Sequence, residues 1–239
     1  MLALLTLVPT LRNPFAMAKD SFHASAKPAL VCPWRQEWPV KPAPGQPSPY
    51  ASQCGQDAFL DTVLFAGAKG GLYLDIGCND GKSNSNTWFF NRHRQWTGVC
   101  FEADPKKFSE IKFSGRSDGI NAAVSKTDGT AAFSVVNVAD GGLSGLSDTL
   151  DHARAKTFGP MRGVFNVPTV SPLTLLKTHY KNASRALDFV SIDVEGHELE
   201  VLRAWPLRGG GSRVSDQRGT KPGTKPWCVN VFTVENNHW

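Results

Sequence analysis

An acid-led glycine turn is the feature of this chain that most directly suggests chemistry. Residues 73–81 read Tyr-Leu-Asp-Ile-Gly-Cys-Asn-Asp-Gly, so an apolar run carries Asp75 to the end of an expected strand. Gly77 and Gly81 then frame a tight turn, where the missing Cβ lets the backbone approach a ligand. A polar segment, 83–87, is expected to open a helix. This order predicts a nucleotide-type site at the carboxyl edge of a parallel sheet.

The residues of the turn indicate which class of ligand it favours. The pattern D-x-G-x-N-x-G does not match the dinucleotide fingerprint G-x-G-x-x-G or the full phosphate-binding P-loop pattern. The turn leads with an acid and is interpreted as offering no lysine to a phosphate. These features favour a ligand without phosphates, such as S-adenosylmethionine, over NAD or ATP. A plain turn in some other α/β protein is the alternative.

A second acid follows at the spacing of a β-α-β unit. Residues 97–104 form another short apolar run that ends in Glu102 and Asp104. An acid about twenty residues beyond the first turn can reach the same cleft and accept hydrogen bonds from both ribose hydroxyls. Asp104 precedes Pro105 and is expected to cap the next helix instead. The alternative for Glu102 is a solvated charge at a strand end.

Further apolar runs and helical segments alternate along the rest of the chain. Runs rich in Val, Ile and Phe suit strands that are buried on both faces. Such strands are expected within 119–124, 187–198 and 229–236, with helices near 85–95, 105–113, 172–181 and 197–205. This alternation predicts an α/β fold, a doubly wound Rossmann-like sheet with its functional edge at the carboxyl ends of the strands.

Several separated motifs together resemble the FkbM-type S-adenosylmethionine-dependent methyltransferases over about residues 52–236. They are Ser-Gln-Cys-Gly-Gln-Asp at 52–57, the turn at 73–81 with Ser83 and Thr87, 96–105, Ser-Gly-Leu at 144–146, Ser-Ile-Asp-Val-Glu-Gly-His-Glu from 191, and Thr-Val-Glu-Asn at 233–236. The resemblance implies methyl transfer, usually to an oxygen, with S-adenosylmethionine as cofactor. The expected cofactor-binding residues are Asp75, Gly77, Asn79, Gly81, Ser83, Glu102, Ala122 and Ser144.

Two departures from the broader methyltransferase pattern are visible. Asn79 stands where many families carry the middle glycine, and Asn tolerates the left-handed conformation that such a turn needs. The class also continues past its fifth strand into a further strand pair, whereas this sequence ends at Trp239. The expected sheet therefore lacks the usual final strand pair.

The residues after the fourth expected strand are the candidate catalytic groups. Methyl transfer is an in-line displacement, so most of the catalysis is positioning, and the acceptor proton must also be removed. His197 is the candidate base because its unperturbed pKa lies near neutrality. A histidine that packs or caps the helix beginning at Gly196 is the structural alternative. Asp193 is expected to fix the cofactor or the acceptor, and Glu195 to orient His197 or bind the acceptor.

A metal-assisted mechanism is an alternative. Asp193 and the pair Glu235-Asn236 follow neighbouring expected strands and could offer oxygen ligands to Mg²⁺, similar to catechol-type O-methyltransferases. Such an ion would lower the pKa of the acceptor hydroxyl. Zinc is not expected, because the five cysteines form no C-x-x-C pair. Cys78 and Cys100 are interpreted as small buried hydrophobic residues.

Composition and the terminal segments predict how the chain is divided into a folded domain and flanking segments. The 239 residues suit one domain, and the net charge of +5 is scattered, so no nucleic-acid partner is expected. Residues 1–49 are interpreted as a disordered or targeting segment with a Pro-rich linker, followed by a domain at 50–239 with a mobile insertion at 208–226. The apolar stretch 1–10 is too short to span a bilayer and could be a transit or signal sequence, otherwise the protein is cytoplasmic.

Two classes of function compete. The first is an O-methyltransferase acting on a hydroxyl of a small molecule or carbohydrate. The second is a truncated or inactive relative that serves as a binding module. The motifs at 75–81, Glu102 and 193–198 favour the first class, while the end at Trp239 and the segment 208–226 favour the second. The sequence carries no signal of an oligomeric state.

Overall fold

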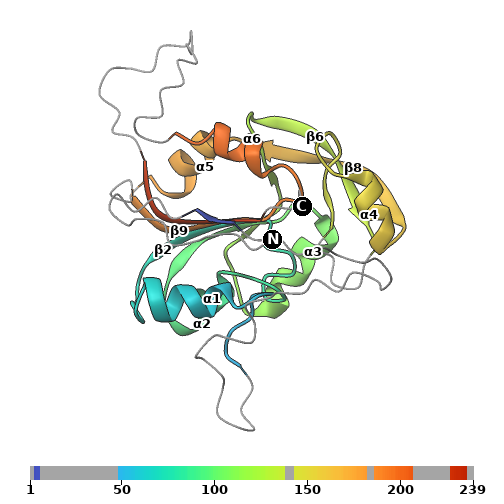
Figure 1. The fold of residues 1–239 in the computed structure, drawn as a ribbon. Helices are drawn as coiled ribbons and strands as arrows, with labels where there is room; N and C mark the ends of the chain where they lie inside the picture. Colours follow the sequence, from blue (N-terminus) through green and yellow to red (C-terminus); the bar gives the residue numbers. More distant parts are fainter. Residues whose placement is uncertain (1–2, 6–47, 138–142, 182–185, 207–226, 236–239) are drawn as a thin grey trace, which may run out of the picture.

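The computed structural model describes residues 3–5, 48–137, 143–181, 186–206 and 227–235, and the following account concerns these residues. They form a mixed α/β protein with two sheets (Figure 1). Among them, no helix has both the length and the apolar character needed to cross a bilayer.

The main sheet is parallel except at one edge. Its strand order is β1-β10-β9-β2-β3-β4, and each neighbouring pair from β10 to β4 is parallel. The strands are β1 (Ala3–Leu5), β2 (Leu72–Ile76), β3 (Thr97–Phe101), β4 (Gly119–Ile120), β9 (Ala186–Ile192) and β10 (Cys228–Val234). Four of these strands lie within the apolar runs that predicted them or overlap them closely, because both of their faces are covered.

Helices cover both faces of this sheet. Figure 1 shows α1 (Gln56–Phe59) and α2 (Trp88–His93) on one side, and α5 (Pro172–His179) and α6 (Glu198–Arg203) on the other. Successive strand residues point to opposite faces. Tyr73 accordingly packs in the cluster that contains Phe90 of α2, whereas Leu74 packs in the cluster that contains Leu175 of α5. The main sheet is therefore packed between two hydrophobic cores, one on each face, which hold its strands in place.

Helix starts follow the expected local chemistry. Asp104 accepts a hydrogen bond from Lys106 N at the start of α3 (Pro105–Glu110), so the predicted cap is confirmed. Ser171 caps α5 in the same way, with Pro172 in the first turn. Short irregular helices extend α1 and α3 over Leu60–Leu64 and Ile111–Ser114.

A second, smaller sheet was not predicted. Its order is β5-β8-β6-β7, built from β5 (Ala123–Val124), β6 (Gly129–Val136), β7 (Gly145–Leu146) and β8 (Met161–Val170), with α4 (His152–Phe158) between β7 and β8. The run 119–124, expected as one strand, divides between the two sheets. Much of β6 and β8 is small or exposed, so these strands lack the apolar signal of buried ones.

The edge beyond β10 also differs from expectation. Ala3–Leu5 pairs antiparallel with β10 through Ala3↔Val234 and Leu5↔Phe232, although the folded domain was expected to begin near Tyr50. No strand pair following β10 is present among the described residues, and β1 occupies the position beside β10. The remainder of 1–47 and the predicted insertion at 208–226 lie outside the described residues.

Candidate active site

A cavity of about 300 Å³ lies where the parallel strands end. Its lining includes predicted residues from four neighbouring strands and from the second sheet. They are Asp75, Gly77, Asn79, Ser83, Glu102, Ala122, Ser144, Asp193, Glu195, His197 and Glu235. The rule that carboxyl ends of parallel strands meet at one edge thus brings segments far apart in sequence into one site.

The glycine turn is shaped by close backbone approach. Gly77 has φ 87°, and a Cβ there would lie 1.7 Å from the Asp193 carbonyl oxygen, so only glycine fits between β2 and the end of β9. Asn79 adopts φ 52°, the left-handed conformation expected of it. Gly81 (φ 82°) does not line the cavity; its Cα faces Ser114 and Ile111, so its role is in the turn itself.

One sequence interpretation of the turn needs correction. Lys82 and Ser83 follow Gly81 directly, so a Gly-Lys-Ser triplet is present, although its spacing from Gly77 is not that of a P-loop. The ammonium of Lys82 lies 5.0 Å from the centre of the Trp88 ring. Lys82 does not line the cavity. Among the described residues no lysine lines the cavity, and this follows from the geometry of the turn and not from its sequence.

Asp75 lies beneath the turn in a buried polar network. Its carboxylate accepts hydrogen bonds from Thr87 Oγ1 at 2.5 Å and from Arg116 Nη1 at 3.3 Å. The Arg116 side chain is fully buried and also binds Asp118 at 2.9 Å. Burial raises the pKa of Asp75, and Arg116 opposes that shift. Sequence reasoning missed Arg116, because a single arginine in the polar run 114–118 looks like a surface residue.

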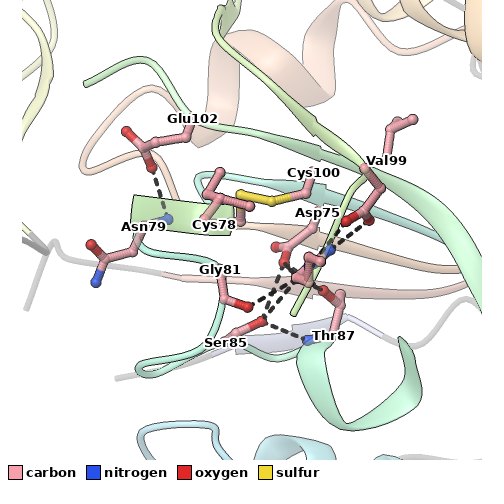
Figure 2. Close-up of a disulfide and its surroundings, with 12 residues drawn as sticks. Asp75, Cys78, Asn79, Gly81, Ser85, Thr87, Val99, Cys100 and Glu102 are labelled. Atoms are coloured by element: carbon pink, nitrogen blue, oxygen red, sulfur yellow. Dashed lines mark hydrogen bonds and ion pairs between the residues drawn. A yellow bond between two sulfur atoms is a disulfide. The ribbon is translucent and has the colours of Figure 1, made fainter. Parts of the chain in front are cut away.

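Glu102 is buried and lines the cavity. Figure 2 shows its carboxylate directed at the backbone of Asn79. Its Oε2 accepts a hydrogen bond from Asn79 N at 2.8 Å and its Oε1 accepts one from Asp104 N at 2.7 Å. Burial raises the pKa of Glu102 to about 7. The alternative of a solvated charge at the strand end is therefore wrong. A carboxylate has about four acceptor positions, so Glu102 can still accept a further donor.

A disulfide joins the turn to the neighbouring strand. Cys78 bonds to Cys100 of β3, with the two Cα atoms 5.9 Å apart (Figure 2). Both residues are buried as predicted, but their interpretation as unbonded hydrophobic side chains is wrong. Asp75 pairs with Cys100 in the sheet, so the turn after β2 brings Cys78 back onto β3. This adjacency depends on strand order, which cysteine spacing alone does not give.

Three acidic side chains gather at the ends of β9 and β10. Carboxylate oxygens of Asp193, Glu195 and Glu235 all lie within 4.8 Å of one another. Burial, reinforced by Glu235, raises the pKa of Asp193 well above its usual range and that of Glu195 to about 9. Arg154 lies 4.0 Å from Glu195 and partly opposes the shift. Glu195 therefore holds its proton at a pH where an exposed carboxyl would release it, and the pKa of Asp193 is shifted in the same direction.

The cluster has oxygen atoms available to a ligand. Glu235 Oε2 is buried and has no hydrogen-bond partner among the described residues. Carboxylate oxygens of this kind suit a proton, a cationic group or a hard divalent ion. Asp193 and Glu235 of the predicted Mg²⁺ set do come together, joined by Glu195, while Asn236 lies outside the described residues.

His197 is held from both sides. Its Nε2 lies 2.9 Å from Ser125 Oγ and its Nδ1 lies 3.0 Å from Thr149 Oγ1, and the residue is 1% exposed. Burial lowers its pKa. A base would have to give up one of these hydrogen bonds, so the geometry favours the structural alternative. Glu198 completes this turn by accepting hydrogen bonds from Gly196 N.

The second sheet closes the cavity with apolar side chains. Phe133 of β6, Leu146 of β7 and Phe158 of α4 line it beside Ala122. Ser144 lines it as well, and its hydroxyl accepts a hydrogen bond from Val136 N at 3.0 Å. These apolar walls were missed because their sheet was not predicted. They provide a surface for a flat apolar ring.

Comparison with known proteins identifies one family. The family model described as Methyltransferase FkbM domain matches residues 75–231. The match begins at the first acid of the glycine turn and ends within β10, so it contains the turn, Glu102, Asp193 and Glu195. No curated protein and no solved structure matched the chain.

Proposed function

The chain belongs to the FkbM methyltransferase family, and from this premise we propose that it is an S-adenosylmethionine-dependent O-methyltransferase with a Rossmann-like, doubly wound core. The proposed acceptor is a hydroxyl of a small molecule or carbohydrate. The main support for this proposal is that the glycine turn, Glu102 and the acidic cluster all line one cavity.

The charges around the cavity support this cofactor. Glu102, Asp193 and Glu195 line it, whereas Arg154 is the one arginine or lysine among the described lining residues. These carboxyls offer acceptor oxygens to an ammonium group and, when ionised, attract a sulfonium, whereas a phosphate finds few donors and meets their ionised forms unfavourably. The volume of about 300 Å³ is at the lower end of small-molecule sites. The residues present therefore fit S-adenosylmethionine better than NAD or ATP.

We assign the cofactor contacts by chemistry. Glu102 accepts hydrogen bonds from the ribose hydroxyls with the lone pairs that Asn79 N and Asp104 N leave unused. Ala122 and Phe133 contact the adenine ring, and the backbone at Gly77 allows the approach of the amino acid part. When bound, S-adenosylmethionine supplies an electrophilic methyl group on its sulfonium.

The acidic cluster is the proposed site of proton acceptance. Asp193 and Glu195 line the cavity and have raised pKa values, so in their ionised forms they bind a proton more strongly than exposed carboxylates. Glu235 Oε2 offers a further acceptor to the substrate hydroxyl. His197, held by Ser125 and Thr149, positions the turn before α6. The protein thus orients the acceptor and holds its proton.

Radiolabelled methyl transfer to fractionated metabolites tests this function. The protein should transfer label to a hydroxyl compound, and Asp193→Asn should lower the rate at least tenfold with donor affinity changed less than threefold. Glu200→Gln, a carboxylate on α6 paired with Arg203, is the matched control and should leave the rate unchanged. Donor binding without transfer to any acceptor would instead support a binding module.

A further inference from the structure

Arg116 occupies a position that the proposed function does not explain. It follows η2 (Ile111–Ser114) and precedes β4, and its guanidinium is fully buried next to β2. A guanidinium has five N–H donors in a rigid fork and cannot be neutralised by losing a proton. Its burial therefore requires partners on every side.

The partners of Arg116 lie at both ends of the glycine turn. Nη1 donates to Asp75 Oδ2 at 3.3 Å, before the turn, and to the Gly81 carbonyl at 3.5 Å, at its end. The same atom donates to Thr87 Oγ1 at 3.0 Å, the residue that precedes α2. One side chain thus connects the strand, the turn and the start of the following helix.

The other side of the fork anchors Arg116 itself. Nε and Nη2 donate to the two carboxylate oxygens of Asp118 at 3.0 and 2.9 Å. Nη2 also donates to Tyr73 Oη at 3.3 Å, and the guanidinium carbon lies 5.3 Å from the centre of the Tyr73 ring. This bidentate geometry is one that a lysine ammonium cannot reproduce.

We propose that Arg116 is the positioning residue of the methyl-donor site: it holds Asp75, Gly81 and Thr87 so that the glycine turn keeps the shape that the donor requires. Arg116 does not line the cavity, so it acts through the turn and not by contact with the donor. The role in donor binding rests on the proposed function. The role in holding the turn rests on the contacts alone.

The structure provides a matched control. Arg94 also forms a bidentate pair with a buried carboxylate, Asp61, at 2.6 and 2.8 Å, but neither residue lines the cavity or touches the glycine turn. Arg94→Lys and Arg116→Lys therefore make the same chemical change in two bidentate pairs, each with a buried carboxylate, although the Arg94 side chain is 27% exposed and that of Arg116 is fully buried. Only the second changes the support of the turn.

The experiment combines calorimetric titration with S-adenosylmethionine and amide hydrogen exchange of the full chain. Arg116→Lys should weaken donor binding at least tenfold and speed exchange at least tenfold within residues 77–87. Arg94→Lys should leave both within twofold. Thr87→Val, which removes the hydroxyl between Arg116 and Asp75, should weaken binding three- to tenfold, and it decides the question if Arg116→Lys does not fold.

Wild-type affinity in both Arg116→Lys and Thr87→Val, with unchanged exchange at 77–87, would overturn the inference. Equal losses in Arg94→Lys would also overturn it, since the effect would then be general destabilisation. If the wild-type chain does not bind the donor, the proposed function fails, and the exchange measurement alone decides whether Arg116 holds the turn.

Discussion

Buried carboxyls occur in two parts of the cavity region, and the two sets differ in the groups that surround them. Around the glycine turn, Asp75 has Arg116 as a partner, and Glu102 accepts two backbone N–H groups. At the ends of β9 and β10, Asp193 and Glu195 have acidic neighbours instead, with Arg154 reaching only Glu195 at 4.0 Å. Burial raises the pKa values of both groups, but Arg116 and backbone N–H groups oppose the shift around the turn, whereas acidic neighbours add to it at the ends of β9 and β10.

This difference separates the parts that hold shape from the part that can react. A carboxyl that is held by a buried cation or by backbone N–H groups is fixed in position, so it suits the support of a loop. A carboxyl whose pKa is raised by acidic neighbours as well as by burial can hold or release a proton without breaking a close ion pair, so it suits proton transfer. We therefore expect substitutions near the turn to affect stability and donor binding, and substitutions in the acidic cluster to affect rate and pH dependence.

The largest expected contrast is in stability. Arg116→Met leaves Asp75 and Asp118 without their buried cation and should lower the free energy of unfolding by about 3–5 kcal/mol in urea titrations. Asp193→Asn replaces a buried carboxyl, whose pKa is raised by burial and by Glu235, with a neutral amide of the same shape, so it should change stability by less than about 1 kcal/mol. Equal losses would show that the two carboxyl groups are not differently compensated.

Removal of the disulfide should give the next largest effect, again on the stability of the region around the glycine turn. Replacing Cys78 and Cys100 together by Ser removes a cross-link between residues separated by 22 positions, with an expected loss of about 3 kcal/mol in unfolding free energy. Cys228→Ser, at a free and exposed cysteine, is the control and should be neutral. If the double variant is as stable as wild type, then the cross-link does not contribute to the stability of the turn.

Glu102 should affect donor binding more than stability. Glu102→Ala removes the proposed ribose acceptor and should weaken S-adenosylmethionine binding by about 2–3 kcal/mol, or thirty- to a hundredfold, in calorimetry. Asp188→Ala, at an acid beside Leu72 that does not line the cavity, is the control. A loss of only twofold in Glu102→Ala would contradict the assignment of Glu102 as the acceptor for the ribose hydroxyls.

The acidic cluster should appear in the pH dependence of stability. The folded-state pKa of Glu195 is about 9 against 4.5 unfolded, so its contribution is fully present below about pH 4.5 and is lost as pH rises through about 9. Glu195→Gln should therefore flatten the decline between pH 5.5 and 8.5 by at least about 1 kcal/mol, since one pKa unit is worth about 1.4 kcal/mol. Parallel curves for variant and wild type would contradict the shift.

Sequence predicted those features that depend on local chemistry and strand burial. Continuous apolar runs gave β2, β3, β9 and β10, and the edge rule for parallel strands then brought Asp75, Glu102 and Asp193 to one cavity. The cap at Asp104 followed from the proline after it. These signals are local, or they follow from one topological rule.

The missed features depend on contacts between distant segments. Arg116 has no local signal, since its burial results from Asp75, Thr87 and Asp118 meeting around it. The Cys78–Cys100 bond required knowing that β2 and β3 are neighbours. The second sheet is weakly apolar in sequence, and its buried side chains, among them Phe133 and Leu146, pack in a cluster with Ala103, which follows β3.

The most direct test of the account is calorimetric titration of the full chain with S-adenosylmethionine and, in parallel, with NAD. The acid-led turn, the ribose acceptor Glu102 and the carboxylates around the cavity predict micromolar binding of S-adenosylmethionine and no measurable binding of NAD. Micromolar binding of NAD with no heat from S-adenosylmethionine would contradict it.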